Sequence, residues 1–183
     1  MPFGLGFFAT AGVSAAAGSF DLLETQVLGS SQASVTFSSL GTYSNYKHLQ
    51  IRMVARASRS GATTDPLIVK LNSTTQTYGH HLFGNGSSVG SGNIATSYSL
   101  LDAITGATAT ANAFGACVID ILDPFETTKN KTIRALTGAN TVVSLSSTFW
   151  NFTTAVSSIE LSAFSATNFL VGSRFSLYGI KGA

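Results

Sequence analysis

The stretch Lys47-His48-Leu49-Gln50-Ile51-Arg52-Met53-Val54-Ala55-Arg56 decides the fold class of this chain of 183 residues. Its side chains alternate between apolar and polar, which is the period of an extended strand with one buried face. The buried set is Leu49, Ile51, Met53 and Ala55. The solvent-facing set is His48, Gln50, Arg52 and Arg56. The pattern therefore predicts a half-buried β-strand.

The same period of two recurs along the chain in short runs bounded by turn residues. Clusters such as Gly84-Asn85-Gly86-Ser87-Ser88 and Asp123-Pro124 separate the runs. Two segments can depart from the pattern, namely 97–109 with a short helical turn and 123–130 as a polar loop. The remaining runs are 34–38, 66–71, 76–83, 94–103, 113–122, 131–136, 141–150, 157–164 and 174–181.

This spacing predicts an all-β chain folded as an antiparallel β-sandwich. A jelly roll of about eight strands fits better than an immunoglobulin fold, because the loops are uneven and the tryptophan–disulfide core is missing. Cys117 is the single cysteine and lies in an apolar run, so it is expected in the core.

The composition indicates a folded chain that associates with other chains. Charged residues make up 10% of the sequence, against a usual share of about 25%. A hydrophobic fraction of 44% and a net charge of +2 are unlike those of disordered chains. With so few charges on its surface, the chain is expected to form a stable oligomer, with a homotrimer as the favoured form.

The first 20 residues carry no charged side chain and are interpreted as an extended apolar docking arm, with residues 21–183 as one β-sandwich domain. Burial of an apolar side chain supplies roughly 1.5–3 kcal/mol, whereas ordering the backbone costs about 1–2 kcal/mol per residue. The arm therefore needs main-chain hydrogen bonds as well, as in an added strand or a threaded peptide. The expected anchors are Phe3, Leu5, Phe7 and Phe8.

Three other interpretations of this segment remain open. A secretory leader would have Lys or Arg ahead of a continuous apolar core, and a membrane span would have about 20 predominantly apolar residues. Neither pattern is present, because no Lys or Arg precedes the apolar residues, and glycine and hydroxyl residues interrupt them. The third interpretation, for the part after Leu5, is an ordinary first strand packed on the core of the same chain.

No catalytic, metal or cofactor site is expected. A glycosidase would need two carboxylates facing each other, and only Asp120 and Glu160 lie within apolar strands. His80 and His81 are adjacent, so in a strand they point to opposite faces and do not chelate one metal. No Gly-x-Ser-x-Gly elbow flanked by a strand and a helix is expected. The chain is thus predicted not to be an enzyme.

The densest basic feature is Arg52, Arg56 and Arg59. Nucleic-acid binding would need a broader cationic field with stacking aromatics, so it is not expected. The first two arginines share a face of the predicted strand, which is interpreted as solvated or as contacting another subunit.

Four segments resemble small virion proteins of tailed bacteriophages, especially aquatic phages, over about residues 20–183. They are the runs 46–52, 81–88, 118–123 with 131–134, and 175–181; the last reads Phe175-Ser176-Leu177-Tyr178-Gly179-Ile180-Lys181. The resemblance implies a structural role of the decoration or tail-fibre type and carries over no catalytic residue.

The expected function is that of a non-enzymatic virion component, made in the host cytoplasm and held on the virion surface through its arm. Its partners would be other copies of itself and capsid or tail proteins, without nucleic acid and without membrane insertion. The arm could dock on a different protein or on a sister subunit, and the sequence leaves both open.

The alternative is a tail-tip module that recognises a host surface glycan. Its candidate loop residues are His80, His81, Asn85 and Trp150, since sugars stack on exposed rings flanked by polar groups. A buried Trp150 is the favoured interpretation of that residue.

Overall fold

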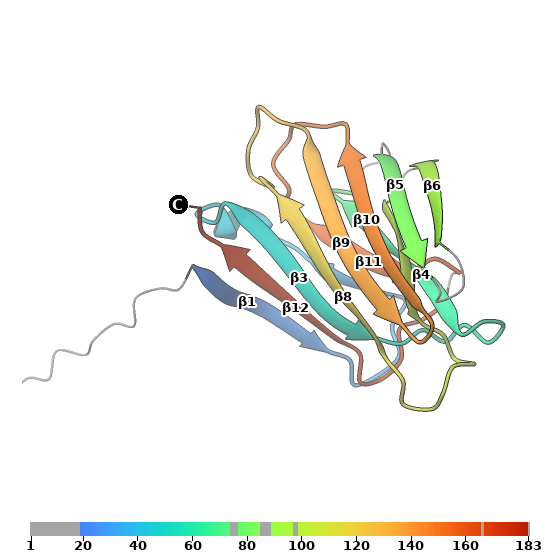
Figure 1. Cartoon of the computed structure of the whole chain (residues 1–183). Coiled ribbons are helices and arrows are strands. Elements are labelled where there is room, and N and C mark those ends of the chain that lie inside the picture. The colour runs from blue at the N-terminus through green and yellow to red at the C-terminus, as the bar shows by residue number, and fades with distance from the viewer. Residues whose placement is uncertain (1–18, 74–76, 85–88, 97–98, 166, 183) are drawn as a thin grey trace, which may run out of the picture.

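A computed structural model describes residues 19–73, 77–84, 89–96, 99–165 and 167–182. These residues form twelve strands and one short 3₁₀ helix, so the predicted all-β class is confirmed (Figure 1). The elements are β1 (Phe20–Val27), β2 (Ser34–Phe37), η1 (Leu40–Tyr43), β3 (His48–Ala55), β4 (Thr64–Leu71), β5 (Thr77–Gly84), β6 (Val89–Thr96), β7 (Ser99–Thr105), β8 (Gly115–Leu122), β9 (Lys131–Ala139), β10 (Val142–Trp150), β11 (Ile159–Ala163) and β12 (Arg174–Ile180).

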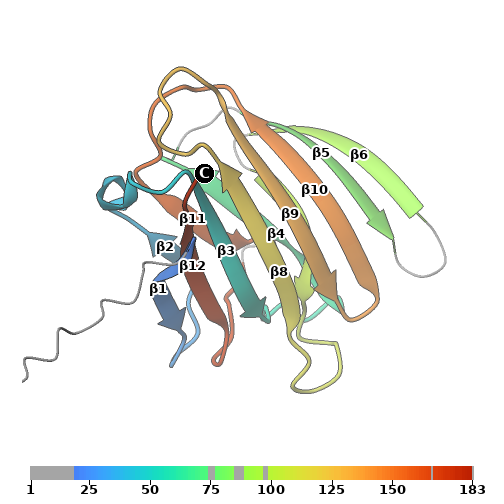
Figure 2. The ribbon, with the colours of Figure 1, turned by 60° about the vertical axis from the view of Figure 1, so that its left-hand side comes forward.

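The strands form two antiparallel sheets that pack face to face. The large sheet has eight strands in the order β1-β12-β3-β8-β9-β10-β5-β6, and the small sheet has four in the order β2-β11-β4-β7. In Figure 2 the β5–β6 end of the large sheet curves away from the rest of the molecule. The architecture is thus a β-sandwich, and its jelly-roll connectivity stays a prediction.

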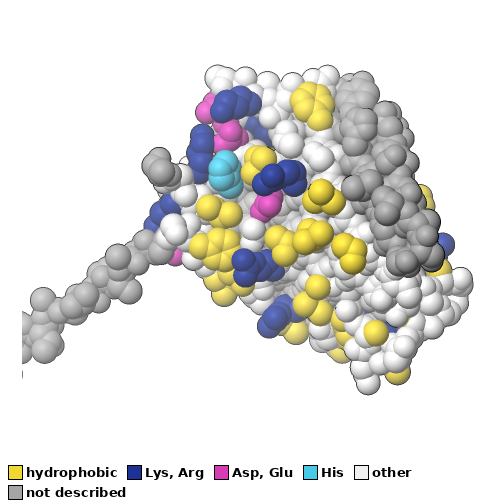
Figure 3. Space-filling view, viewed as in Figure 1, with side chains coloured by type: hydrophobic (Ala, Val, Ile, Leu, Met, Phe, Trp, Pro, Cys, Tyr) yellow, Lys and Arg dark blue, Asp and Glu magenta, His cyan; other side chains and the backbone are white. Residues whose placement is uncertain are grey.

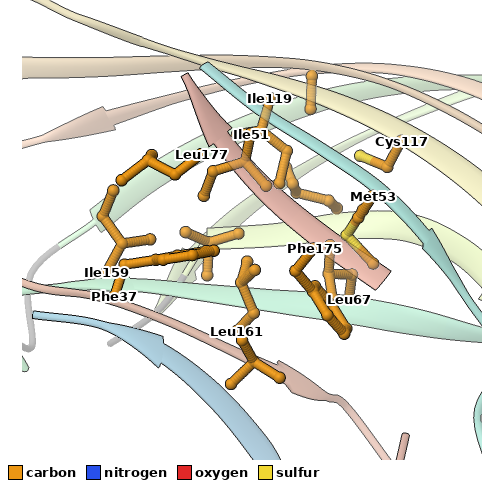
Figure 4. Close-up of a cluster of buried hydrophobic side chains, with 14 of the residues drawn as sticks. Phe37, Ile51, Met53, Leu67, Cys117, Ile119, Ile159, Leu161, Phe175 and Leu177 are labelled. Atoms are coloured by element: carbon orange, nitrogen blue, oxygen red, sulfur yellow. The ribbon is translucent and has the colours of Figure 1, made fainter. Parts of the chain in front are cut away.

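The core lies between the inner faces of the two sheets (Figure 4). The predicted inner set of β3 is confirmed, because Leu49, Ile51, Met53 and Ala55 are all buried. Phe37, Leu67, Ile159 and Leu161 meet them from the small sheet, together with Ile119, Phe175 and Leu177 from the large sheet. Alternating apolar side chains therefore decide which face of each strand turns inward.

Three elements differ from the sequence-based expectation. The run 94–103 contains parts of two strands, since β6 ends at Thr96 in the large sheet and β7 begins at Ser99 in the small one. Residues 40–43 form the helix η1, which had not been predicted. Phe20, assigned to the arm, is the first residue of β1 and pairs with Ile180.

Two positions show how local chemistry sets the sheet geometry. Asn140 joins β9 to β10 with φ of 41°, a left-handed conformation that asparagine tolerates. Gly179 in β12 lies under the Tyr46 ring, where an added Cβ would come within 2.5 Å of ring carbons. Tyr46 in turn donates a hydrogen bond from its hydroxyl to Asp21 in β1, over 2.9 Å. Glycine at position 179 therefore lets this tyrosine tie the outermost strand to the sheet.

Candidate interaction surface

The outer face of the large sheet exposes large apolar side chains, and we call this set the apolar face. Leu136 is 54% exposed and Val143 is 61% exposed. Side chains of this kind gather over the middle of the sheet in Figure 3. The apolar face consists of Phe20, Leu22, Val27, Val54, Leu136, Val143, Leu145 and Phe149. Apolar patches of this kind on soluble proteins mark interaction sites.

Strand β10 contributes three members of the apolar face because its alternation runs opposite to that of an ordinary sandwich strand. Val143, Leu145 and Phe149 are exposed, whereas the hydroxyl residues Ser144, Ser146 and Thr148 are buried on the inner side. The inner side of β10 lies against β7 of the small sheet. The strand therefore presents its more apolar side to the outside.

A groove of about 580 Å³ opens in the apolar face. Five neighbouring strands line it, namely β12, β3, β8, β9 and β10. Its volume falls in the range of pockets that bind small ligands or side chains of a partner. The apolar lining includes Val54, Ala116, Val118, Leu136, Val143 and Tyr178, and two arginines, Arg52 and Arg174, contribute to the lining as well.

Arg52 joins the groove to the beginning of β1. The rings of Phe20 and Tyr178 stack with centroids 4.7 Å apart and an interplanar angle of 19°. The Arg52 guanidinium lies 4.8 Å from the Phe20 centroid and 5.4 Å from that of Tyr178. Its Nε also donates to the side-chain oxygen of Gln50, over 2.9 Å. This cation–π cluster holds the guanidinium of the exposed Arg52 at the surface.

Polar groups on the same face form a hydrogen bond and an ion pair with one another. The Gln50 amide donates to Asp120 over 2.7 Å, and Arg134 lies 3.8 Å from the other carboxylate oxygen of Asp120. Asp120 is the sole acidic residue among the outer positions of β3, β8, β9, β10 and β12, which are described in full. The face as a whole is therefore apolar with an excess of arginine.

Arg56 does not belong to this surface, so its predicted place beside Arg52 is wrong. β3 ends at Ala55, and Arg56 is buried. Its guanidinium donates four hydrogen bonds of 2.7–2.9 Å to main-chain carbonyls of the loop that precedes β8. The accepting carbonyls belong to Ala107, Ala109, Thr110 and Ala113. A buried charge requires such partners, so this arginine organises the loop.

Arg59, the third arginine of the basic feature, also faces a partner of the same chain. Its Nη1 lies 3.7 Å from the fully buried carboxylate of Asp65. The same carboxylate accepts hydrogen bonds of 2.7 Å from the hydroxyls of Ser165 and Thr167. Of the three arginines, only Arg52 is exposed on the large sheet.

A second, polar hollow of about 220 Å³ lies beside Asp123, where β3 begins and β8 ends. Lys47 and Lys129 each approach an Asp123 oxygen to 3.2 Å. Burial alone would raise the pKa of Asp123, but these two ammonium groups outweigh it and lower the pKa. The Asp123 amide donates to His48 Nδ1 over 3.1 Å. These charges therefore pair with one another.

Lys131 is a buried base close to that hollow. Its ammonium donates to the carbonyls of Glu126, Lys129 and Thr153, the last two over 3.1 Å. Burial lowers the pKa of Lys131, while the charges of Glu126 and Asp123 oppose the shift. The contacts are all to main-chain oxygens, so this lysine closes the end of the core.

The predicted glycan-loop residues do not form a described site. Trp150 is fully buried, and its ring meets that of Phe152 edge to face at 6.1 Å. An exposed stacking role for Trp150 is therefore wrong, because the ring has no free face to offer. His80 and His81 lie on β5, whose side chains fall outside the described part of the chain, and Asn85 lies outside it entirely. The arm anchors Phe3, Leu5, Phe7 and Phe8 also lie outside the described residues.

Asp120 and Glu160 do not meet. Asp120 lies on the outer side of β8 in the large sheet, and Glu160 lies on β11 in the small sheet, 3.4 Å from Lys70. The outer faces of the two sheets point in opposite directions, so these carboxylates do not share a cleft. Among the residues that the structure describes, no group of three metal-ligating side chains is present. The described chain also forms no helix long and apolar enough to cross a membrane.

The apolar face itself had not been predicted from the sequence. The signal that could have found it is the alternation in Val142–Trp150, where one parity carries Val143, Leu145 and Phe149 and the other carries hydroxyl residues. Either parity could face inward, since Trp150 belongs to the hydroxyl set. Only the packing against β7 decides between them.

Comparison of the chain with protein-family models, with curated proteins and with solved structures found no match.

Proposed function

We propose that this chain is a non-enzymatic structural component of a tailed-phage virion, an oligomeric β-sandwich held on the particle surface through its apolar N-terminal arm. The observation that carries the proposal is the apolar face with its 580 Å³ groove. A stable surface protein whose sheet exposes Leu136, Val143, Leu145 and Phe149 requires a partner to cover them.

Two properties of the sequence support the same role. The first 20 residues carry four large apolar anchors and no charged side chain. The resemblance to small phage virion proteins covers about residues 20–183 and gives the context. A component of this kind is made in the host cytoplasm and functions at the virion surface, where it serves as decoration or as part of a fibre.

The alternative, a tail-tip module that recognises a host glycan, has less support. The stacking ring proposed for it from the sequence is that of Trp150, and that ring is buried. We therefore keep the structural role as the proposed function.

The test is the copy number of the chain in purified virions, measured by quantitative mass spectrometry against the major capsid subunit. A number comparable to that of the capsid subunit supports a decoration protein of the head, and a handful of copies supports a place on the tail. An abundant host protein, quantified in the same sample, measures carry-over. A copy number no higher than this carry-over would contradict the proposal.

A further inference from the structure

The groove in the apolar face has no occupant within the described chain, although five strands line it. Its walls carry Val54, Leu136 and Val143, all exposed to solvent. What covers these side chains must itself be largely apolar, because a polar group buried against them would lose its hydrogen bonds to water without gaining a partner.

A second copy of the same face is a poor occupant. Arg52, Arg134 and Arg174 project from its outer positions, against the single carboxylate of Asp120. Pairing this face with itself would bring arginines toward arginines, and like charges at an interface oppose association. An uncharged apolar segment meets no such opposition.

The chain contains one segment of this kind, residues 1–18. It has no charged side chain, and Phe3, Leu5, Phe7 and Phe8 concentrate its large apolar groups within six residues. Eighteen extended residues reach about 60 Å, whereas β1, with eight, spans about 27 Å. The segment is therefore long enough to reach a neighbouring subunit.

The topology favours the groove of a neighbour over the chain's own. The arm joins β1 at Phe20, which pairs with Ile180 at one end of the large sheet. The groove lies toward the opposite end, where Val27 pairs with Arg174. An arm that extends β1 beyond Phe20 leads away from the groove of its own subunit. It would have to turn back on itself to enter that groove.

The groove also supplies donors for the main chain of the arm. Arg52 and Arg174 line it, and both are exposed at its surface. The chain already uses a guanidinium in this way, since Arg56 donates to four main-chain carbonyls of one loop. The guanidinium groups of the groove can hold the carbonyls of an incoming segment by the same chemistry.

We infer that the groove of one subunit binds residues 3–8 of the arm of another copy of this chain, an inference that rests on the proposed assembly role of the arm. Each copy gives one arm and receives one, so the contact is heterologous and closes into a ring when the rotation between subunits permits. A trimer is one such ring.

The experiment cross-links the full-length chain through engineered cysteines. The double variant Leu5→Cys with Val143→Cys places one thiol on the arm and one in the groove. The matched control is Leu5→Cys with Thr36→Cys, because Thr36 is exposed on β2 in the other sheet. The native Cys117 also lines the groove but is only 3% exposed, and any link that involves it is recognised by the mass of the linked peptides.

Isotope-labelled and unlabelled chains are co-expressed, oxidised and analysed by mass spectrometry of the linked peptides. The expected result is a link between positions 5 and 143 that joins labelled to unlabelled chains, at least about tenfold above the control. Links confined to single chains, or no excess over the control, would overturn the inference.

A second variant gives an independent readout without cysteines. Val143→Asp places a carboxylate in the groove at a position that is 61% exposed, so the fold is expected to tolerate it. We expect its oligomer to dissociate with a constant raised about tenfold or more, as happens when the centre of an interface is disrupted. Unfolding curves that match the parent chain identify a folded variant, and an unchanged oligomer in such a variant would overturn the inference.

The two proposals can fail separately. A chain absent from virions that still shows the link between positions 5 and 143 would contradict the phage role and leave the arm exchange standing. A chain present in virions without that link would contradict the arm exchange alone.

Discussion

Replacement of Arg56 by methionine is expected to destabilise the chain strongly, although Arg56 does not line the groove. Methionine fills a similar length of side chain but offers no donor to the carbonyls of Ala107, Ala109, Thr110 and Ala113. The loop that carries these carbonyls leads directly into β8, a central strand of the large sheet. Loss of the guanidinium should therefore loosen the loop.

The magnitude follows from the exposure of the accepting carbonyls. A hydrogen bond to a charged group contributes about 1.5–3 kcal/mol, but water can replace it where the residue is partly exposed. Thr110 is exposed and Ala107 and Ala113 are half-buried, whereas Ala109 is buried and its carbonyl would lose its partner. We expect a net loss of about 2–4 kcal/mol in the free energy of unfolding, which lowers the melting temperature by roughly 5–15 °C for a chain of this size.

The assay is urea unfolding, combined with hydrogen exchange of the amides in residues 106–114. Arg56→Lys is the matched control, since an ammonium can reach some of the same carbonyls and should recover part of the stability. Faster exchange in this loop, with little change in β11, is expected for Arg56→Met. A loss below about 0.5 kcal/mol, the size of an ordinary surface substitution, would refute the reasoning.

Three further predictions concern single groups. Cys117, with a pKa raised to about 12 by burial, should react with iodoacetamide at pH 8 only after unfolding, and rapid labelling of the native chain would contradict its place in the core. Trp150 should fluoresce at short wavelength and resist quenching by iodide, whereas quenching as efficient as that of free indole would mean that the ring is exposed. The pKa of Asp123 lies below its ordinary value of 3.8 because of Lys47 and Lys129, so its contribution to stability is present above that pH and is lost as the pH falls through the lowered pKa. Asp123→Asn should therefore lower stability at pH 7 and flatten the acid limb of the stability curve below about pH 4, and equal acid limbs for both chains would contradict the pairing.

The sequence was most informative where apolar and polar side chains alternate and only one face of the strand is apolar. In β3 the apolar set Leu49, Ile51, Met53 and Ala55 could point only toward the core, so both the strand and its inner face were predicted correctly. The loop 123–130 was also predicted, since Asp123-Pro124 breaks the pattern. Local pattern and global packing agree in these elements.

Other features depend on contacts that no local pattern contains. Arg56 continues the polar parity of β3, yet the strand ends one residue earlier and the guanidinium binds a loop 51–57 residues downstream. In β10 two parities compete, and the packing of Ser144, Ser146 and Thr148 against β7 decides that the apolar parity stays outside. The apolar face therefore could not be predicted from the sequence, although it is the feature on which the proposed function depends most.

The most direct test of the assembly role is the number of chains carried by purified particles when the source virus is supplied with the full-length chain or, separately, with a chain that lacks residues 1–18. Both chains must first give the same far-ultraviolet spectrum and comparable melting temperatures. We predict that the full-length chain co-purifies at a fixed copy number per particle and that the shortened chain remains in the soluble fraction. Equal copy numbers for the two chains would contradict the account, because the arm would then have no part in assembly.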